Sequence, residues 1–64
     1  MTIEIHLNSP EGNAFFILSK VQQAMRESGA SREEIRQYQD DAMSGDYLKL
    51  LEESEKRVDI VFVS

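Results

Sequence analysis

Apolar and polar residues alternate at both ends of the sequence, and this pattern constrains the fold more than any other feature. Over residues 2–8 the apolar positions are Ile3, Ile5 and Leu7. Over residues 57–63 they are Val58, Ile60 and Phe62 on one face, joined by Val61 and Val63 on the other. A period of two is typical of β-strands with one buried face. We therefore expect a strand at each end, the second covered on both faces near its finish or ending at an interface.

Three segments with helical periodicity lie between these strands. The first opens at Ser9-Pro10, a pair suited to the cap and first position of a helix, and is expected to run to Ser28. The second starts at Ser31, which has the capping-box pattern, and ends near Met43. The third follows Asp46, another capping residue. This order predicts β-α-α-α-β.

The predicted fold class is α+β, with a two-stranded terminal sheet packed against helices in a single domain over residues 1–64. The pattern leaves open whether the strands run parallel or antiparallel. A chain of this length buries only about 60% of the surface that its unfolded form exposes, and a two-stranded sheet is weak alone. We therefore expect a homo-oligomer, in which a homodimer extends the sheet across its axis.

The charge balance narrows the classes of partner. Twelve Asp and Glu residues stand against seven Lys and Arg residues, a net charge of −5. Nucleic acids and anionic membrane surfaces both require clustered cations, so we expect neither as a direct partner. No apolar run approaches the roughly 20 residues of a membrane span, and no export leader is recognised. Together with the absence of cysteine, this indicates a cytoplasmic protein.

The reactive residue types form no recognisable catalytic or metal-binding pattern. The single histidine, His6, has Glu4 as a neighbour on the same strand face, which makes a pair without a third group. Asp40, Asp41 and Asp46 surround a glycine turn but lack the spacing of a calcium-binding loop. We therefore expect no catalysis, no metal and no cofactor, and the acidic residues are interpreted as solvated or as helix caps.

Two apolar surfaces and one acidic surface are candidates for binding a partner. Phe16 projects on the polar side of the first predicted helix and Phe15 on its flank, where an aromatic needs cover from the same domain or from a partner. Val61 and Val63 are the second apolar candidate. The acidic candidates are Glu52, Glu53 and Glu55. They either form a solvated face or steer a basic partner by mimicking phosphates.

A weaker candidate for ligand binding lies at the start of the first predicted helix. Glu11, Gly12 and Asn13 stand where a phosphate can dock on backbone N–H groups. The segment contains a single glycine, no lysine and one carboxylate, all of which disfavour an anion.

Two segments carry a resemblance to known proteins. The stretch SPEGNAF from Ser9 to Phe15 and the stretch SGDYLKLL from Ser44 to Leu51 resemble a group of small proteins encoded by bacteriophages and prophages. The resemblance implies a host protein as partner and the cytoplasm of the bacterial host as location. It transfers no catalytic residue.

The first hypothesis is therefore a small acidic, non-enzymatic interaction protein that binds a host protein, for example as an inhibitor of a bacterial defence system. One alternative is a protein that binds or sequesters a small molecule or nucleotide signal. The other is a structural accessory protein.

Overall fold

The computed structural model describes residues 2–64 and confirms the predicted β-α-α-α-β order. Its elements are β1 (Ile3–His6), the short 3-10 helix η1 (Pro10–Gly12), α1 (Ala14–Glu27), α2 (Arg32–Ala42), α3 (Tyr47–Arg57) and β2 (Ile60–Val63).

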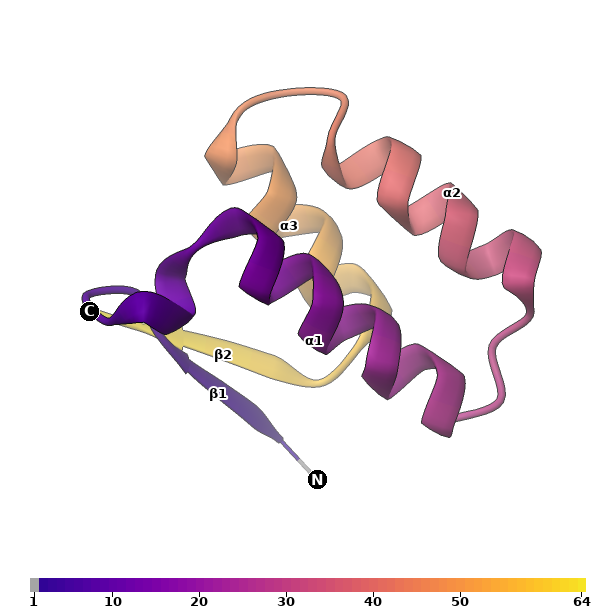
Figure 1. Ribbon diagram of the computed structural model, residues 1–64, viewed down its shortest axis with the longest axis horizontal. Coiled ribbons are helices and arrows are strands. Elements are labelled where there is room, and N and C mark those ends of the chain that lie inside the picture. Colours follow the sequence, from indigo (N-terminus) through magenta and orange to yellow (C-terminus); the bar gives the residue numbers. More distant parts are fainter. Residues whose placement is uncertain (1) are drawn as a thin grey trace.

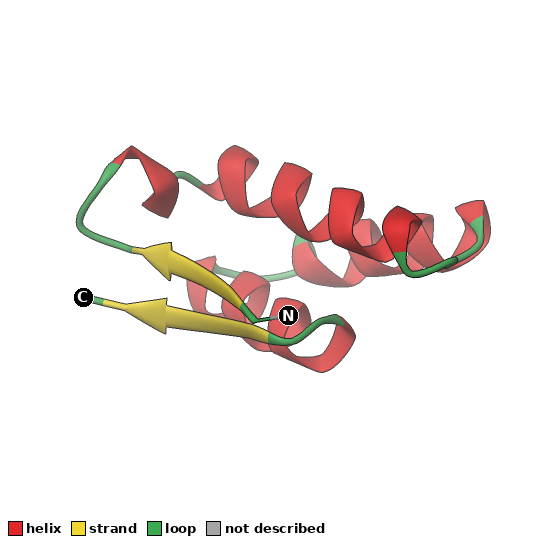
Figure 2. Ribbon diagram, turned by 90° about the horizontal axis from the view of Figure 1, so that it is seen from below, coloured by secondary structure: helices red, strands yellow, loops and turns green. Residues whose placement is uncertain are grey.

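The two strands run parallel, which answers the question that the sequence left open. Ile3 pairs with Ile60 and His6 pairs with Val63, and Figure 2 shows both arrows pointing the same way. The strands are parallel because three helices connect them. Each of α1, α2 and α3 reverses the direction of the chain, so an odd number returns it to the starting end of β1 (Figure 1).

The helices cover only one face of this sheet. Figure 1 shows the strands along one side of α1 and α3, and α2 along the opposite side. Side chains from all five regular elements meet between these layers. The buried apolar residues are Ile5, Ile17, Leu18, Val21, Met25, Tyr38, Ala42, Leu50 and Ile60. No described element crosses the other face of the sheet, which is turned toward the viewer in Figure 2.

The first helix does not begin as the sequence predicted. Instead of one helix from Ser9-Pro10, the chain forms η1, breaks at Asn13 in an extended conformation (φ −65°, ψ 135°), and only then starts α1. The Asn13 side chain accepts a hydrogen bond from the Phe15 N–H and so caps α1. The expectation of a continuous helix was wrong because two capping residues, Ser9 and Asn13, stand four positions apart.

The later helix boundaries agree with the sequence. Ser31 and Glu34 form both hydrogen bonds of a capping box at the start of α2. Asp46 caps α3 by accepting from the Lys49 N–H. Gly29 separates α1 from α2 with a φ of +92°, a conformation that glycine adopts without steric penalty.

Candidate functional site

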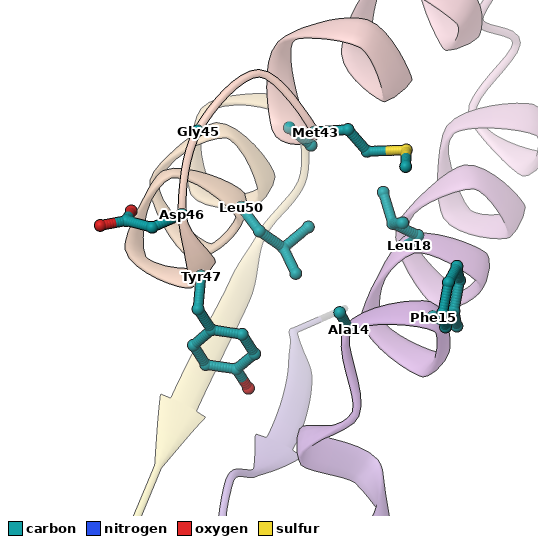
Figure 3. Close-up of a pocket in the computed structure, with 9 residues that line it drawn as sticks. Ala14, Phe15, Leu18, Met43, Gly45, Asp46, Tyr47 and Leu50 are labelled. Atoms are coloured by element: carbon teal, nitrogen blue, oxygen red, sulfur yellow. The ribbon is translucent and has the colours of Figure 1, made fainter.

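An apolar groove lies at one end of the molecule. It lies where α1 begins, α2 ends and α3 begins, and its volume is about 320 Å³. Figure 3 shows Leu18 and Leu50 approaching each other from opposite walls, with Met43 above them. The lining residues are Ala14, Phe15, Leu18, Ala42, Met43, Gly45, Asp46, Tyr47 and Leu50.

Two helix caps and one long-range hydrogen bond position these walls. Asn13 starts α1 so that Ala14 and Leu18 face the groove, and Asp46 starts α3 so that Tyr47 and Leu50 face it from the other side. The Tyr47 hydroxyl then donates to the Gly12 carbonyl oxygen, which ties α3 to η1. Three of the lining residues, Leu18, Ala42 and Leu50, are also buried core residues.

The rim of the groove is apolar and strongly exposed. Phe15 is 71% exposed, Met43 58% and Tyr47 40%. Large apolar side chains exposed around a concave apolar surface are typical of a binding site. The sequence analysis named Phe15 but missed Met43 and Tyr47. One sequence feature could have indicated the groove: Tyr47 is a large aromatic residue at the first position of a helix, directly after the Gly45-Asp46 turn.

The electrostatic environment of the groove is acidic. Asp46 lines the groove, Asp40 and Asp41 directly precede its lining residues Ala42 and Met43, and Glu11 directly precedes Gly12, whose carbonyl oxygen accepts from Tyr47. Of these carboxylates, Asp41 is paired with Arg57 at 3.1 Å. The nearest cation in sequence, Lys49, is held 3.3 Å from a carboxylate oxygen of Glu53. Within residues 2–64, no ion pair engages Glu11, Asp40 or Asp46.

The acidic run on α3 does not form one surface. Glu52 and Glu55 are exposed, whereas Glu53 is only 6% exposed. Its Oε2 lies 3.0 Å from Lys56 Nζ and 3.3 Å from Lys49 Nζ. The hydrogen bond from Lys56 holds the pKa of Glu53 below its ordinary value, and the same contact raises the pKa of Lys56. The interpretation of Glu53 as part of a solvated face was therefore wrong.

Ser54, next to Glu53, belongs to a buried polar contact that the sequence did not reveal. Its hydroxyl lies 2.7 Å from the Tyr38 hydroxyl and donates to the Leu50 carbonyl oxygen at 2.8 Å. Because Ser54 has a single hydroxyl hydrogen, Tyr38 is the donor in the pair. Both residues are fully buried, and burial raises the pKa of Tyr38 above 10.0.

The polar groups of the candidate ligand segment are used inside the protein. The Gly12 N–H donates to the Ser9 carbonyl oxygen and the Asn13 N–H to that of Pro10. The Glu11 carboxylate accepts from the His6 N–H at 3.0 Å. A phosphate would have to displace these hydrogen bonds, so the segment acts in this structure as a brace between β1 and α1.

The remaining partner candidates lie apart from the groove. Phe16 is 40% exposed, about half as much as Phe15, and does not line the groove. Val61 is 45% exposed on the outer face of the sheet, opposite Glu4, and Val63 is partly buried. Of the apolar candidates, Phe15 therefore lies at the groove among the helices, and Val61 lies on the outer face of the sheet.

The side chains of His6 and Glu4 form an exposed pair, in which His6 Nε2 lies 3.0 Å from Glu4 Oε1. No cluster of three potential metal ligands is found among the same residues. None of the described helices is long and apolar enough to cross a bilayer.

Comparisons with protein-family models, curated proteins and solved structures found no match for this chain.

Proposed function

We propose that the protein is a non-catalytic binding protein whose groove receives apolar side chains of a partner protein. The observation that carries the proposal is the rim of the groove, where Phe15 and Met43 are each more than half exposed beside a hollow apolar surface. When a partner covers such side chains, the removal of apolar surface from water contributes a favourable free energy of about 25 cal/mol per Å². Aromatic anchors of this kind dominate the binding energy of many protein interfaces.

The charges around the groove define the chemistry of the partner. Glu11, Asp40 and Asp46 have no cationic partner within the described residues, so this end of the molecule attracts positive charge. The partner segment that fits is therefore amphipathic, with apolar side chains to fill the groove and lysine or arginine on either side. Complementary charges of this kind fix orientation and speed association.

The resemblance to phage and prophage proteins supports a host protein as the partner. Its two segments, Ser9–Phe15 and Ser44–Leu51, contain six of the lining residues, namely Ala14, Phe15, Gly45, Asp46, Tyr47 and Leu50. A protein that occupies a basic amphipathic surface of a host factor would inhibit that factor by exclusion. Components of bacterial defence systems are one class of such factors.

Adjacent phenylalanines provide a matched test of this proposal. Immobilised wild-type protein, Phe15→Ser and Phe16→Ser are incubated with bacterial lysate, and the recovered proteins are quantified by mass spectrometry. We expect a stoichiometric partner that is lost with Phe15→Ser, because Phe15 lines the groove, and retained with Phe16→Ser. Circular dichroism establishes that both variants are folded. Equal recovery with all three proteins, or no stoichiometric partner, contradicts the proposal.

An apolar small molecule is a second candidate for the groove. Its volume of about 320 Å³ falls at the lower end of the roughly 300–1,000 Å³ of ligand pockets. Native mass spectrometry of protein isolated from its producing cell would then show an added mass that disappears in Phe15→Ser.

A further inference from the structure

The free side of β1 is blocked by the protein itself at His6, one of its two outward-directed residues. In a parallel pair, alternate residues direct their backbone groups away from the neighbouring strand. On β1 the outward N–H of His6 donates to Glu11 Oε1 at 3.0 Å. The outward carbonyl oxygen of His6 accepts from both the N–H and the hydroxyl of Ser9, at 3.1 and 2.7 Å. Side-chain covering of this type protects an edge strand from adding another chain.

The free side of β2 has no such cover. The carbonyl oxygens of Asp59 and Val63 point toward β1, where they accept from Ile3 and Leu7 at 2.8 and 2.7 Å. Ile60 and Phe62 alternate with them and therefore direct their N–H and C=O groups away from β1. No hydrogen bond within residues 2–64 engages these outward groups. The β1 edge is thus blocked at His6, whereas the β2 edge carries no block at either of its outward residues.

The composition of β2 favours a second copy of this chain at the open edge. Each copy carries a net charge of −5, so most surfaces of two copies repel each other. The strand Ile60–Val63 is uncharged, and its exposed Val61 offers an apolar surface that is complementary to itself. An isolated two-stranded sheet is marginal; here the helices support one face, and a four-stranded sheet would also satisfy the open edge of β2.

The neighbouring helix α3 also carries an exposed apolar side chain. Figure 2 shows α3 running behind β2 and past its free side. Helical spacing places Leu48 near Leu51 on α3, on the side away from Leu50, and Leu48 is 64% exposed.

We propose that two copies join through their β2 strands, antiparallel, around a two-fold axis at Val61. In this register Ile60 and Phe62 of one copy exchange backbone hydrogen bonds with Phe62 and Ile60 of the other. Val61 then meets its counterpart on the outer face, and the sheet order becomes β1-β2-β2-β1. This inference goes beyond the proposed function, because it uses the sheet edge and leaves the groove free.

Val61→Lys and Thr2→Lys test the proposal with equal changes of charge. Within one copy, Val61→Lys places its ammonium opposite Glu4 in the strand register, so the fold is retained. Across the two-fold axis it brings two ammonium groups together. Thr2→Lys introduces the same charge beside Asp59, whose carboxylate accepts from Thr2 at 2.7 Å, away from the axis. Sedimentation equilibrium over a range of concentrations measures the mass of each protein.

We expect a dimer for the wild type and for Thr2→Lys, and loss of the dimer for Val61→Lys. Hydrogen exchange of the wild type gives a second measurement that needs no variant: the Ile60 and Phe62 amides become protected as concentration rises. A wild type that stays monomeric overturns the proposal, and so does a Val61→Lys dimer as stable as that of Thr2→Lys. Protection of both amides in a monomer also overturns it, since the chain then covers its own edge.

Discussion

At the scale of single residues, Gly12 has the tightest requirement in the structure. A Cβ atom built there would lie 2.3 Å from the carbonyl oxygen of Leu7 and 2.9 Å from its carbonyl carbon. Both are backbone atoms of the segment that leaves β1, so neither can move without disturbing the brace. The Gly12 carbonyl oxygen also accepts from the Tyr47 hydroxyl. This glycine therefore permits the contact between the strand, η1 and the groove.

We predict that Gly12→Ala destabilises the protein by about 1–3 kcal/mol, the usual range for overpacking. Urea denaturation followed by circular dichroism measures the change. Gly45→Ala is the matched control, because its Cβ would meet no backbone atom and would approach Lys49 Cβ and Cγ at the milder distances of 3.1 and 3.2 Å. There we expect a change within about 0.5 kcal/mol, as for ordinary surface substitutions. Equal effects at the two glycines would show that the close approach to Leu7 is unimportant.

At the scale of elements, the contact between α2 and α3 depends on polar groups as well as apolar packing. Tyr38 reaches from α2 to Ser54 of α3 in the interior, and Arg57 of α3 lies 3.1 Å from Asp41 of α2 nearer the surface. The apolar stripe of α2 is narrow, with Tyr38 and Ala42 its only buried residues. The orientation of α2 therefore depends strongly on one hydroxyl pair.

Tyr38→Phe is predicted to lower the free energy of unfolding by about 1 kcal/mol at neutral pH, the typical contribution of one hydrogen bond. The substitution should also make the free energy of unfolding less sensitive to high pH. Because the pKa of Tyr38 is raised by burial, the unfolded chain loses this proton first. The free energy of unfolding therefore falls as pH rises above 10.0 and through the folded pKa. The variant lacks this part of the decline, whereas the part due to Lys56 remains.

Urea denaturation at about pH 8 and about pH 11 separates the two effects. Ser54→Ala serves as the comparison, because it leaves the Tyr38 hydroxyl buried without its partner at a cost of about 1–3 kcal/mol. The double variant should lose less than the sum of the single changes. Additive losses would mean that the two hydroxyls stabilise the protein independently.

At the scale of the whole molecule, charge is unevenly distributed and the two proposed contacts depend on it in opposite ways. Binding of a basic segment at the groove is an attraction between unlike charges. Joining two copies at β2 requires two anions of charge −5 to approach. Salt screens both interactions, with a Debye length of about 8 Å at physiological ionic strength.

We therefore predict that added salt weakens partner binding and strengthens self-association. Affinity for the captured partner and the dimer dissociation constant are measured on the same protein at low and high salt. Val61→Lys should bind the partner with the same salt dependence as the wild type, because the groove is untouched. If both contacts weaken with salt, attraction between unlike charges drives self-association and the β2 edge is not its basis.

The sequence predicted most of this architecture because its signals are local. Alternation identified both strands, and Ser31 and Asp46 marked helix starts through hydrogen bonds to residues three positions away. Apart from the local break at Asn13, what it missed depends on contacts between distant segments. The groove forms only when Met43 and Tyr47 meet α1, and no local pattern encodes that meeting. The buried pair of Tyr38 and Ser54, 16 positions apart, is of the same kind.

Parallel pairing of the two terminal strands also has a consequence for synthesis on the ribosome. Ile3 has no strand partner until Ile60 has been translated. The inner face of β1 therefore stays incompletely covered until all three helices have been synthesised. The helices can form earlier, since their hydrogen bonds are local. A nascent chain would therefore pass through a helical intermediate with an incomplete core. A premature stop codon before Ile60 would leave that intermediate as the final product, a ready substrate for cellular proteases.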